Sequence, residues 1–210
     1  MQRISKVLQG LKYSFYLIFH PGKGFWDLKH EKKGNIGSSI VIVFLLIITF
    51  IIKRQCVGFL FNYNNYKDLN IIVMAASVII PFVLWCVSNW CITTLVDGEG
   101  NFRDIVITSA YALMPLVIIQ IPISIISNFF TFGESGFYTF FIFISVVWTA
   151  FLLVAGIMTV HQFTLGKTIL TIIIAFIGMV IIMFLFILLF ALIQQFINFF
   201  LLLEKEITMR

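Results

Sequence analysis

The chain has 210 residues, of which 61% are hydrophobic and 11% are charged. Soluble domains average about 45–50% apolar and about 25% charged residues, so this composition excludes an ordinary soluble domain. The 25 phenylalanines require burial, which excludes a disordered chain. The net charge of +5 is not gathered into a basic stripe, and nucleic-acid binding is therefore not predicted. These observations predict an integral membrane protein.

Five apolar stretches lie between the charged residues, and a membrane-spanning helix needs about 20 such residues. They are Ile36–Ile52, Leu69–Val96, Ile105–Asn128, Phe137–Val160 and Thr168–Leu203. Because backbone polar groups in lipid must pair within their own segment, we predict an all-α, polytopic transmembrane bundle of five spans. The last stretch is too long for one span. We expect either a span to about Ile193 followed by a short surface helix, or a tilted helix that projects out.

The distribution of Lys and Arg predicts the orientation of this bundle. A cytoplasmic N-terminus places nine of these residues inside and five outside. By the positive-inside rule we predict a multi-pass protein of the cell membrane, with a cytoplasmic N-terminus and an exoplasmic C-terminus. The chain then divides into a cytoplasmic, basic segment 1–35, a membrane domain 36–203 and an exoplasmic tail 204–210.

The first nineteen residues have the pattern of an amphipathic helix, with apolar side chains at helical spacing and basic side chains on the other faces. We expect this helix to lie on the anionic surface of the membrane; the alternative is a helix packed under the bundle. The sequence His20-Pro21-Gly22 should end it.

The turn between the second and third spans contains a third of the acidic residues of the chain. Its sequence is Asp97-Gly98-Glu99-Gly100-Asn101-Phe102-Arg103-Asp104. Two glycines allow a tight backbone path, and Asn101 with Asp104 predicts a capping box at the start of the third span. The segment is either a solvated reverse turn or a docking or ion-binding loop, and its spacing is not that of an EF-hand.

A polar stripe follows one face of the second span. Trp85, Asn89 and Thr93 recur at intervals of four residues, in line with Asp97. We expect Asn89 to point into the bundle, because an unpaired amide in lipid is costly. The stripe serves either contacts between helices or contacts with a transported substrate.

We identify no catalytic, metal-binding or cofactor-binding motif. Cys56, Cys86 and Cys91 have neither zinc-ligand spacing nor the spacing of a disulfide framework. His161 lies on the same predicted membrane face as the acidic turn, but its interfacial position explains it without a metal site. We therefore predict that the protein is not an enzyme and needs no cofactor.

Two groups of residues resemble the signature of the Yip (Ypt/Rab-interacting protein) domain family. The first is the run Asp97–Arg103 with Ala110-Tyr111-Ala112-Leu113-Met114-Pro115. The second is Phe19-His20-Pro21 with Phe25-Trp26-Asp27-Leu28-Lys29, as in short bacterial members. The likeness covers nearly the whole chain. It implies five helices, a cytoplasmic N-terminus and an exoplasmic C-terminus, in agreement with the charge distribution.

Eukaryotic members of that family act in membrane traffic and bind small GTPases. This chain lacks their Asp-Leu-Tyr-Gly-Pro motif and their long N-terminal region, so GTPase binding is not carried over. We predict a non-catalytic scaffold or accessory factor for membrane organisation or for a membrane protein complex, such as a carbohydrate importer. Its expected partners are the lipid bilayer and another membrane protein or a second copy of itself. The alternative is a small transporter or permease-like subunit.

Overall fold

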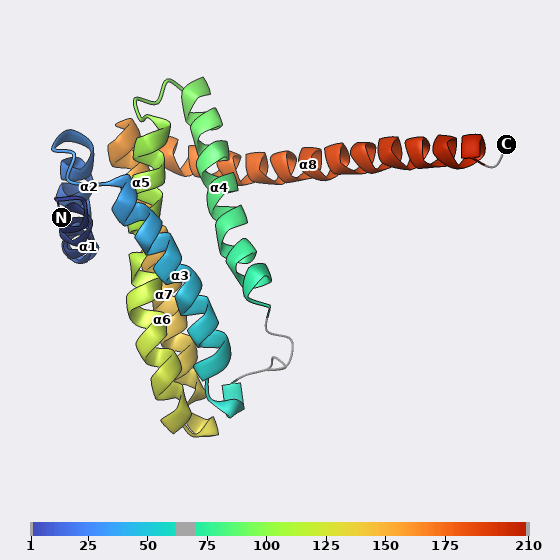
Figure 1. Ribbon diagram of the computed structural model, residues 1–210. Helices are drawn as coiled ribbons and strands as arrows, with labels where there is room; N and C mark the ends of the chain where they lie inside the picture. The colour runs from blue at the N-terminus through green and yellow to red at the C-terminus, as the bar shows by residue number, and fades with distance from the viewer. Residues whose placement is uncertain (1, 62–69, 209–210) are drawn as a thin grey trace.

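The computed structural model describes residues 2–61 and 70–208, and this part of the chain contains helices and no strands. Five helical segments are long and apolar enough to cross a membrane, which confirms the predicted fold class. They are α3 (Ile36–Cys56), α4 (Ile71–Leu95), α5 (Phe102–Ala112) with α6 (Met114–Ile126), α7 (Ser135–His161) and α8 (Leu165–Thr208) (Figure 1). Most of the loop between the first two spans and the end of the C-terminal tail lie outside the described residues.

Asparagine side chains begin three of the spans. Asn35 Oδ1 accepts a hydrogen bond from the Gly37 N–H at 3.3 Å. Asn70 Oδ1 accepts from the backbone amides two and three residues further on, at 3.0 and 3.3 Å. The capping box of Asn101 and Asp104 is present, as predicted, at the start of α5. These side chains satisfy amides that the first helical turn leaves unpaired.

The third span is broken at Leu113, between α5 and α6. Pro115 has no N–H group and its ring excludes the carbonyl four residues earlier, so a regular helix cannot continue through it. Pro81 and Pro122 instead lie inside the continuous helices α4 and α6. The broken span is the most buried of the five, and it lies between α3 and α7 at the centre of the bundle.

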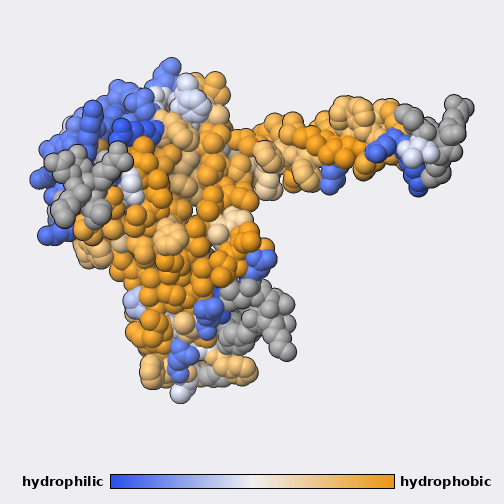
Figure 2. All heavy atoms as spheres, viewed as in Figure 1, coloured by the Kyte–Doolittle hydropathy of each residue, from blue (hydrophilic) through white to orange (hydrophobic). Residues whose placement is uncertain are grey.

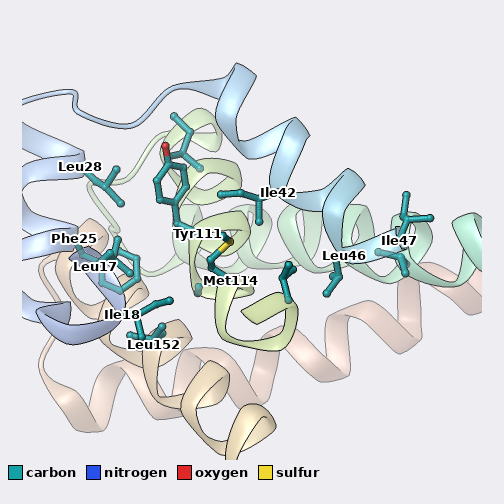
Figure 3. Close-up of a cluster of buried hydrophobic side chains, with 14 residues drawn as sticks. Leu17, Ile18, Phe25, Leu28, Ile42, Leu46, Ile47, Tyr111, Met114 and Leu152 are labelled. Carbon is teal, nitrogen blue, oxygen red and sulfur yellow. The ribbon is translucent and has the colours of Figure 1, made fainter. Parts of the chain in front are cut away.

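The N-terminal segment forms two helices, α1 (Gln2–Phe19) and α2 (Pro21–His30). The predicted break at Pro21 is present, but Pro21 also begins a second helix that the sequence analysis did not predict. Its fixed φ angle suits the first turn of a helix. Leu17 and Ile18 of α1 pack into the main hydrophobic core (Figure 3), while Leu8, on the same helix, stays exposed. The helix therefore packs against the bundle, as in the alternative we considered, and still presents an apolar side outward.

The last helix, α8, is continuous over 44 residues, so no separate surface helix follows Ile193 among the described residues and the alternative of one projecting helix describes it. It crosses α4, where Ser88 Oγ donates a hydrogen bond to the Ala175 carbonyl at 2.6 Å. It then extends sideways, far beyond the other helices (Figure 1), and residues 183–205 are exposed. The face of this part that Figure 2 shows is mostly apolar, and its sequence has apolar residues at nearly every position up to Ile193, so it needs lipid or protein around it.

Candidate functional site

Two helices and two turns meet at one end of the bundle. We call this region the polar cap; it comprises α1, α2, residues 96–101 and residues 162–164. Figure 2 shows hydrophilic side chains gathered at this end of the molecule. Contacts from α2 and from the ends of α7 and α8 hold the acidic turn in place. The predicted docking turn is therefore a fixed part of the fold.

The end of α4 starts this turn with a left-handed residue, Asp97, at φ 54°. The Gly98 N–H donates a hydrogen bond to the Thr93 carbonyl at 2.8 Å, which is the Schellman pattern of a helix C-terminus. Aspartate tolerates the left-handed region better than most residues. Lys167 Nζ donates to the Val96 carbonyl at 2.9 Å and places a positive charge at the negative end of α4. The Asp97 side chain consequently stands exposed at the tip of the turn.

His161, at the end of α7, explains why the turn contains two glycines. Its ring is buried, and Nδ1 accepts a hydrogen bond from the Gly100 N–H at 3.3 Å. A Cβ at Gly98 would lie 2.5 Å from that Nδ1, and a Cβ at Gly100 would lie 2.7 Å from the ring Cε1. A side chain at either position would overlap the ring. His161 therefore does approach the turn, and its buried ring supports the backbone there.

The opposite side of the turn contacts α2 and α4. Lys29 Nζ lies 3.1 Å from Glu99 Oε2, with the Lys29 side chain 14% exposed and the Glu99 side chain 57% exposed. The Phe102 ring meets Trp90 edge to face, with 5.8 Å between the centroids. Asp104 stays at the helix start, where its Oδ2 accepts from the Asn101 N–H at 3.4 Å. The outward carboxylates of the turn are therefore those at positions 97 and 99.

A hydrogen-bonded ion pair that the sequence pattern did not predict joins α1, α2 and the segment before α3, with a buried carboxylate and an exposed ammonium group. Asp27 Oδ2 accepts from Lys33 Nζ at 2.9 Å and from Tyr13 Oη at 3.3 Å. The hydrogen bond from Lys33 lowers the pKa of Asp27, and burial beside this carboxylate raises the pKa of Tyr13. A signal was present in the sequence, because Asp27 is one of just two acids in the basic segment 1–35.

The structure also accounts for the other residues of the segment Phe25-Trp26-Asp27-Leu28-Lys29. Phe25 is fully buried against Gly156 of α7, where a Cβ would lie 3.0 Å from its ring. Leu28 enters the main core, and Lys29 reaches the acidic turn. Trp26 is half exposed and stacks on the His30 ring at 3.8 Å. Phe25 and Leu28 therefore pack α2 against the bundle, and Lys29 connects α2 to the acidic turn.

Tyr111 and Pro115 are not brought to the acidic turn. Tyr111 is fully buried in the main core (Figure 3), and a Cβ at Gly10 would lie 2.7 Å from its hydroxyl oxygen. Gly10 therefore lets α1 approach α5 closely. Pro115 stands at the break between α5 and α6. Arg103 lines a cavity beside the polar cap, together with residues of α1 and of the segment 31–35.

The polar stripe on α4 is buried, as its spacing predicts. Trp85 Nε1 donates to Ser109 Oγ at 3.0 Å, and Thr93 Oγ1 donates to the Asn89 carbonyl at 2.8 Å. The Asn89 amide is completely buried and has no hydrogen-bond partner among the described residues.

A cavity of about 290 Å³ lies beside Trp85, within the membrane-spanning part of the bundle. Its walls are apolar apart from Trp85, Ser77 and Ser109, and Asn89 and Thr93 do not line it. The stripe and the cavity therefore do not join into one polar path. Within residues 2–61 and 70–208, no three His, Cys, Asp or Glu side chains come together as a metal site, and the three cysteines are free.

Comparison with known protein families shows a match to the Yip1 domain over residues 15–201. The matched region begins within α1 and ends near the end of α8, so it contains all five spans and the acidic turn. No curated protein and no solved structure matches the chain.

Proposed function

The chain belongs to the Yip1 domain family, and on this basis we propose that it is a non-catalytic scaffold or accessory factor. In this proposal the polar cap docks another membrane protein, such as a component of a carbohydrate importer, or a second copy of the chain. The cap lies on the cytoplasmic side of the cell membrane, as the distribution of Lys and Arg predicts.

The observation that carries the proposal is the fixed turn with its outward carboxylates. His161 and Lys167 bind the backbone at Gly100 and Val96, and Lys29 binds the Glu99 carboxylate, so three helices hold the turn. Asp97 forms no ion pair among the described residues, and Glu99 is more than half exposed. A preorganised charged loop loses little conformational entropy when a partner binds, and it favours partners that carry basic groups.

Site-specific photo-crosslinking in native membranes tests this role. A crosslinking amino acid at position 97 or 99 should capture the same partner protein, identified by mass spectrometry. The matched control is position 133, which is exposed and lies at the opposite end of the bundle. Capture of the same protein from position 133, or of none from positions 97 and 99, would contradict docking through the turn.

A small transporter subunit is the second candidate, and the buried, unpaired amide of Asn89 is the observation that favours it. Unpaired polar groups inside a membrane protein are costly and often contact a substrate. If this role is right, Asn89→Leu abolishes uptake of the substrate while the protein still folds, and Asp97→Asn does the same. Normal uptake in both variants would exclude it.

A further inference from the structure

A second cavity, of about 570 Å³, lies beside the polar cap, and residues 96–101 of the proposed docking turn do not line it. Three cations and one carboxylate line it, namely Lys32, Lys33, Arg103 and Glu31. Tyr13 and Asn35 are also part of its wall. The volume is within the range of small-ligand sites, about 300–1,000 Å³. The lining is polar and mainly basic, which favours an anionic ligand.

Two of the three cations are available to such a ligand. Lys33 Nζ is already bound by Asp27 at 2.9 Å and by Glu31, and those hydrogen bonds raise the pKa of Lys33. Lys32 and Arg103, by contrast, form no ion pair within the described part of the chain. Lys33 shares its one positive charge between Asp27 and Glu31, so Lys32 and Arg103 are the cations that remain for a ligand.

Two helix N-termini add to the positive potential of this cavity. Asn35 is the N-cap of α3, and Arg103 is the second residue of α5. The partial positive charge of a helix N-terminus favours anions within the first turn. Asn35 and Arg103 both line the cavity, so the first turns of helices of 21 and 11 residues lie beside it.

We propose that this cavity binds a phosphate group, either on the headgroup of an anionic lipid or as a free anion. The Arg103 guanidinium can donate two parallel hydrogen bonds to phosphate oxygens, and the Lys32 ammonium supplies a point charge. The cavity lies at the start of α3, the first apolar span, and we expect the end of such a span at the depth of lipid headgroups. The inference is independent of the docking turn, since it uses other side chains.

Binding is measured on the full chain, purified in an uncharged detergent, by native mass spectrometry and by titration calorimetry. One arm uses dioctanoyl phosphatidylglycerol, and the other uses inorganic phosphate. Lys32→Gln with Arg103→Gln should weaken binding at least tenfold. The control, Lys12→Gln with Lys23→Gln, removes the same charge from exposed sites on α1 and α2 that do not line the cavity and should change binding less than threefold. Thermal unfolding verifies that both double variants remain folded.

Saturable binding of either probe, lost in the Lys32/Arg103 variant and kept in the control, supports the site. The arm in which it occurs identifies the source of the phosphate. Arg103→Lys should bind with an intermediate affinity, because it keeps the charge but loses the two-pronged geometry. Equal losses in the two double variants would show a general surface charge effect and overturn the proposal, as would absence of saturable binding in both arms. If Lys32→Gln/Arg103→Gln does not fold, Arg103→Lys and Lys32→Gln alone carry the same comparison.

Discussion

Glycines at positions 98 and 100 lie where His161 leaves no room for a side chain. The requirement is for space, because neither glycine has a positive φ angle. This gives the Gly-x-Gly pattern of the turn a physical cause, namely the close approach of an imidazole ring to the backbone. The buried His161 ring also depends on residues 98–100, since the Gly100 N–H donates a hydrogen bond to its Nδ1.

We expect Gly98→Ala to lower the free energy of unfolding by about 1–3 kcal/mol, as overpacking of a well-packed site does. Thermal unfolding in detergent measures this loss. Gly133→Ala is the matched control, because a Cβ there meets nothing within 4 Å. In the double variant with His161→Ala the effect of Gly98→Ala should shrink. An equal effect with and without His161 would show that the ring is not the obstacle.

Asp27 is the residue through which pH should act on the polar cap. Its pKa is lowered in the folded protein, mainly by the hydrogen bond from Lys33, so the unfolded chain binds the proton more readily. The ion pair stabilises the fold at neutral pH, and this contribution is lost as pH falls below about 4 through the pKa of the folded state.

Asp27→Asn should therefore lower the melting temperature at pH 7, and its difference from the original protein should shrink between pH 5 and pH 3. Thermal unfolding across this pH range gives the comparison, and the other acids cancel in the difference. A difference that stays constant with pH would contradict the role of the carboxylate charge.

At the scale of elements, the contact between α4 and α8 decides how the longest helix leaves the bundle. Ser88 Oγ donates a hydrogen bond to the Ala175 carbonyl. A Cβ at Gly178 would lie 2.5 Å from Ser88 Oγ. Small residues at such crossings let helix backbones approach closely inside a membrane. Gly178, three residues after Ala175, therefore allows the two helices to cross at this close distance.

Gly178→Leu should separate α8 from α4 and cost about 1–3 kcal/mol of stability in detergent. Ser88→Ala, which removes a single hydrogen bond, should cost about 0.6 kcal/mol. Gly166→Leu, on the same helix but with nothing within 4 Å, is the control. If Gly166→Leu were as damaging as Gly178→Leu, the crossing would not depend on close packing at Gly178.

For the whole molecule, orientation is the property that connects the polar cap to any partner. The span-capable part of α8 has 41 residues, so at 1.5 Å per residue it is about 60 Å long, twice the thickness of the hydrocarbon core. The described end of this helix therefore reaches well past the bundle. The side of the membrane on which this end emerges depends on the orientation of all five spans.

Labelling with a membrane-impermeant maleimide tests the predicted orientation. After replacement of Cys56, Cys86 and Cys91 by serine, Gly133→Cys and Lys205→Cys should be labelled on intact cells. Lys23→Cys should be labelled in inverted vesicles alone, because the polar cap faces the cytoplasm by the positive-inside rule. The reverse pattern would contradict the orientation. Labelling of Lys205→Cys from the same side as Lys23→Cys would show that α8 does not cross the membrane.

Many features of the fold could be predicted because they depend on neighbours in the chain. The five spans follow from continuous hydropathy, and the start of α5 follows from the capping box of Asn101 and Asp104. The buried face that Trp85 and Asn89 share follows from their four-residue spacing. The break at Pro115 could not be predicted, because Pro81 and Pro122 also lack an N–H and yet lie inside continuous helices. No separate helix follows Ile193 among the described residues, because Gln and Asn, unlike Pro, do not interrupt a helix.

By itself, then, the sequence determined a five-span helical membrane protein with one acidic, glycine-containing turn, because hydropathy, capping and proline act over a few residues. Tertiary structure alone decided what holds that turn. Gly100 and His161 are 61 positions apart, and Lys29 and Glu99 are 70 apart, so no local pattern links them. It also decided that the buried Asp27 side chain pairs with Lys33 and that Lys32 and Arg103 line one cavity. Such long-range contacts depend on how the helices pack, and packing is a property of the whole folded chain.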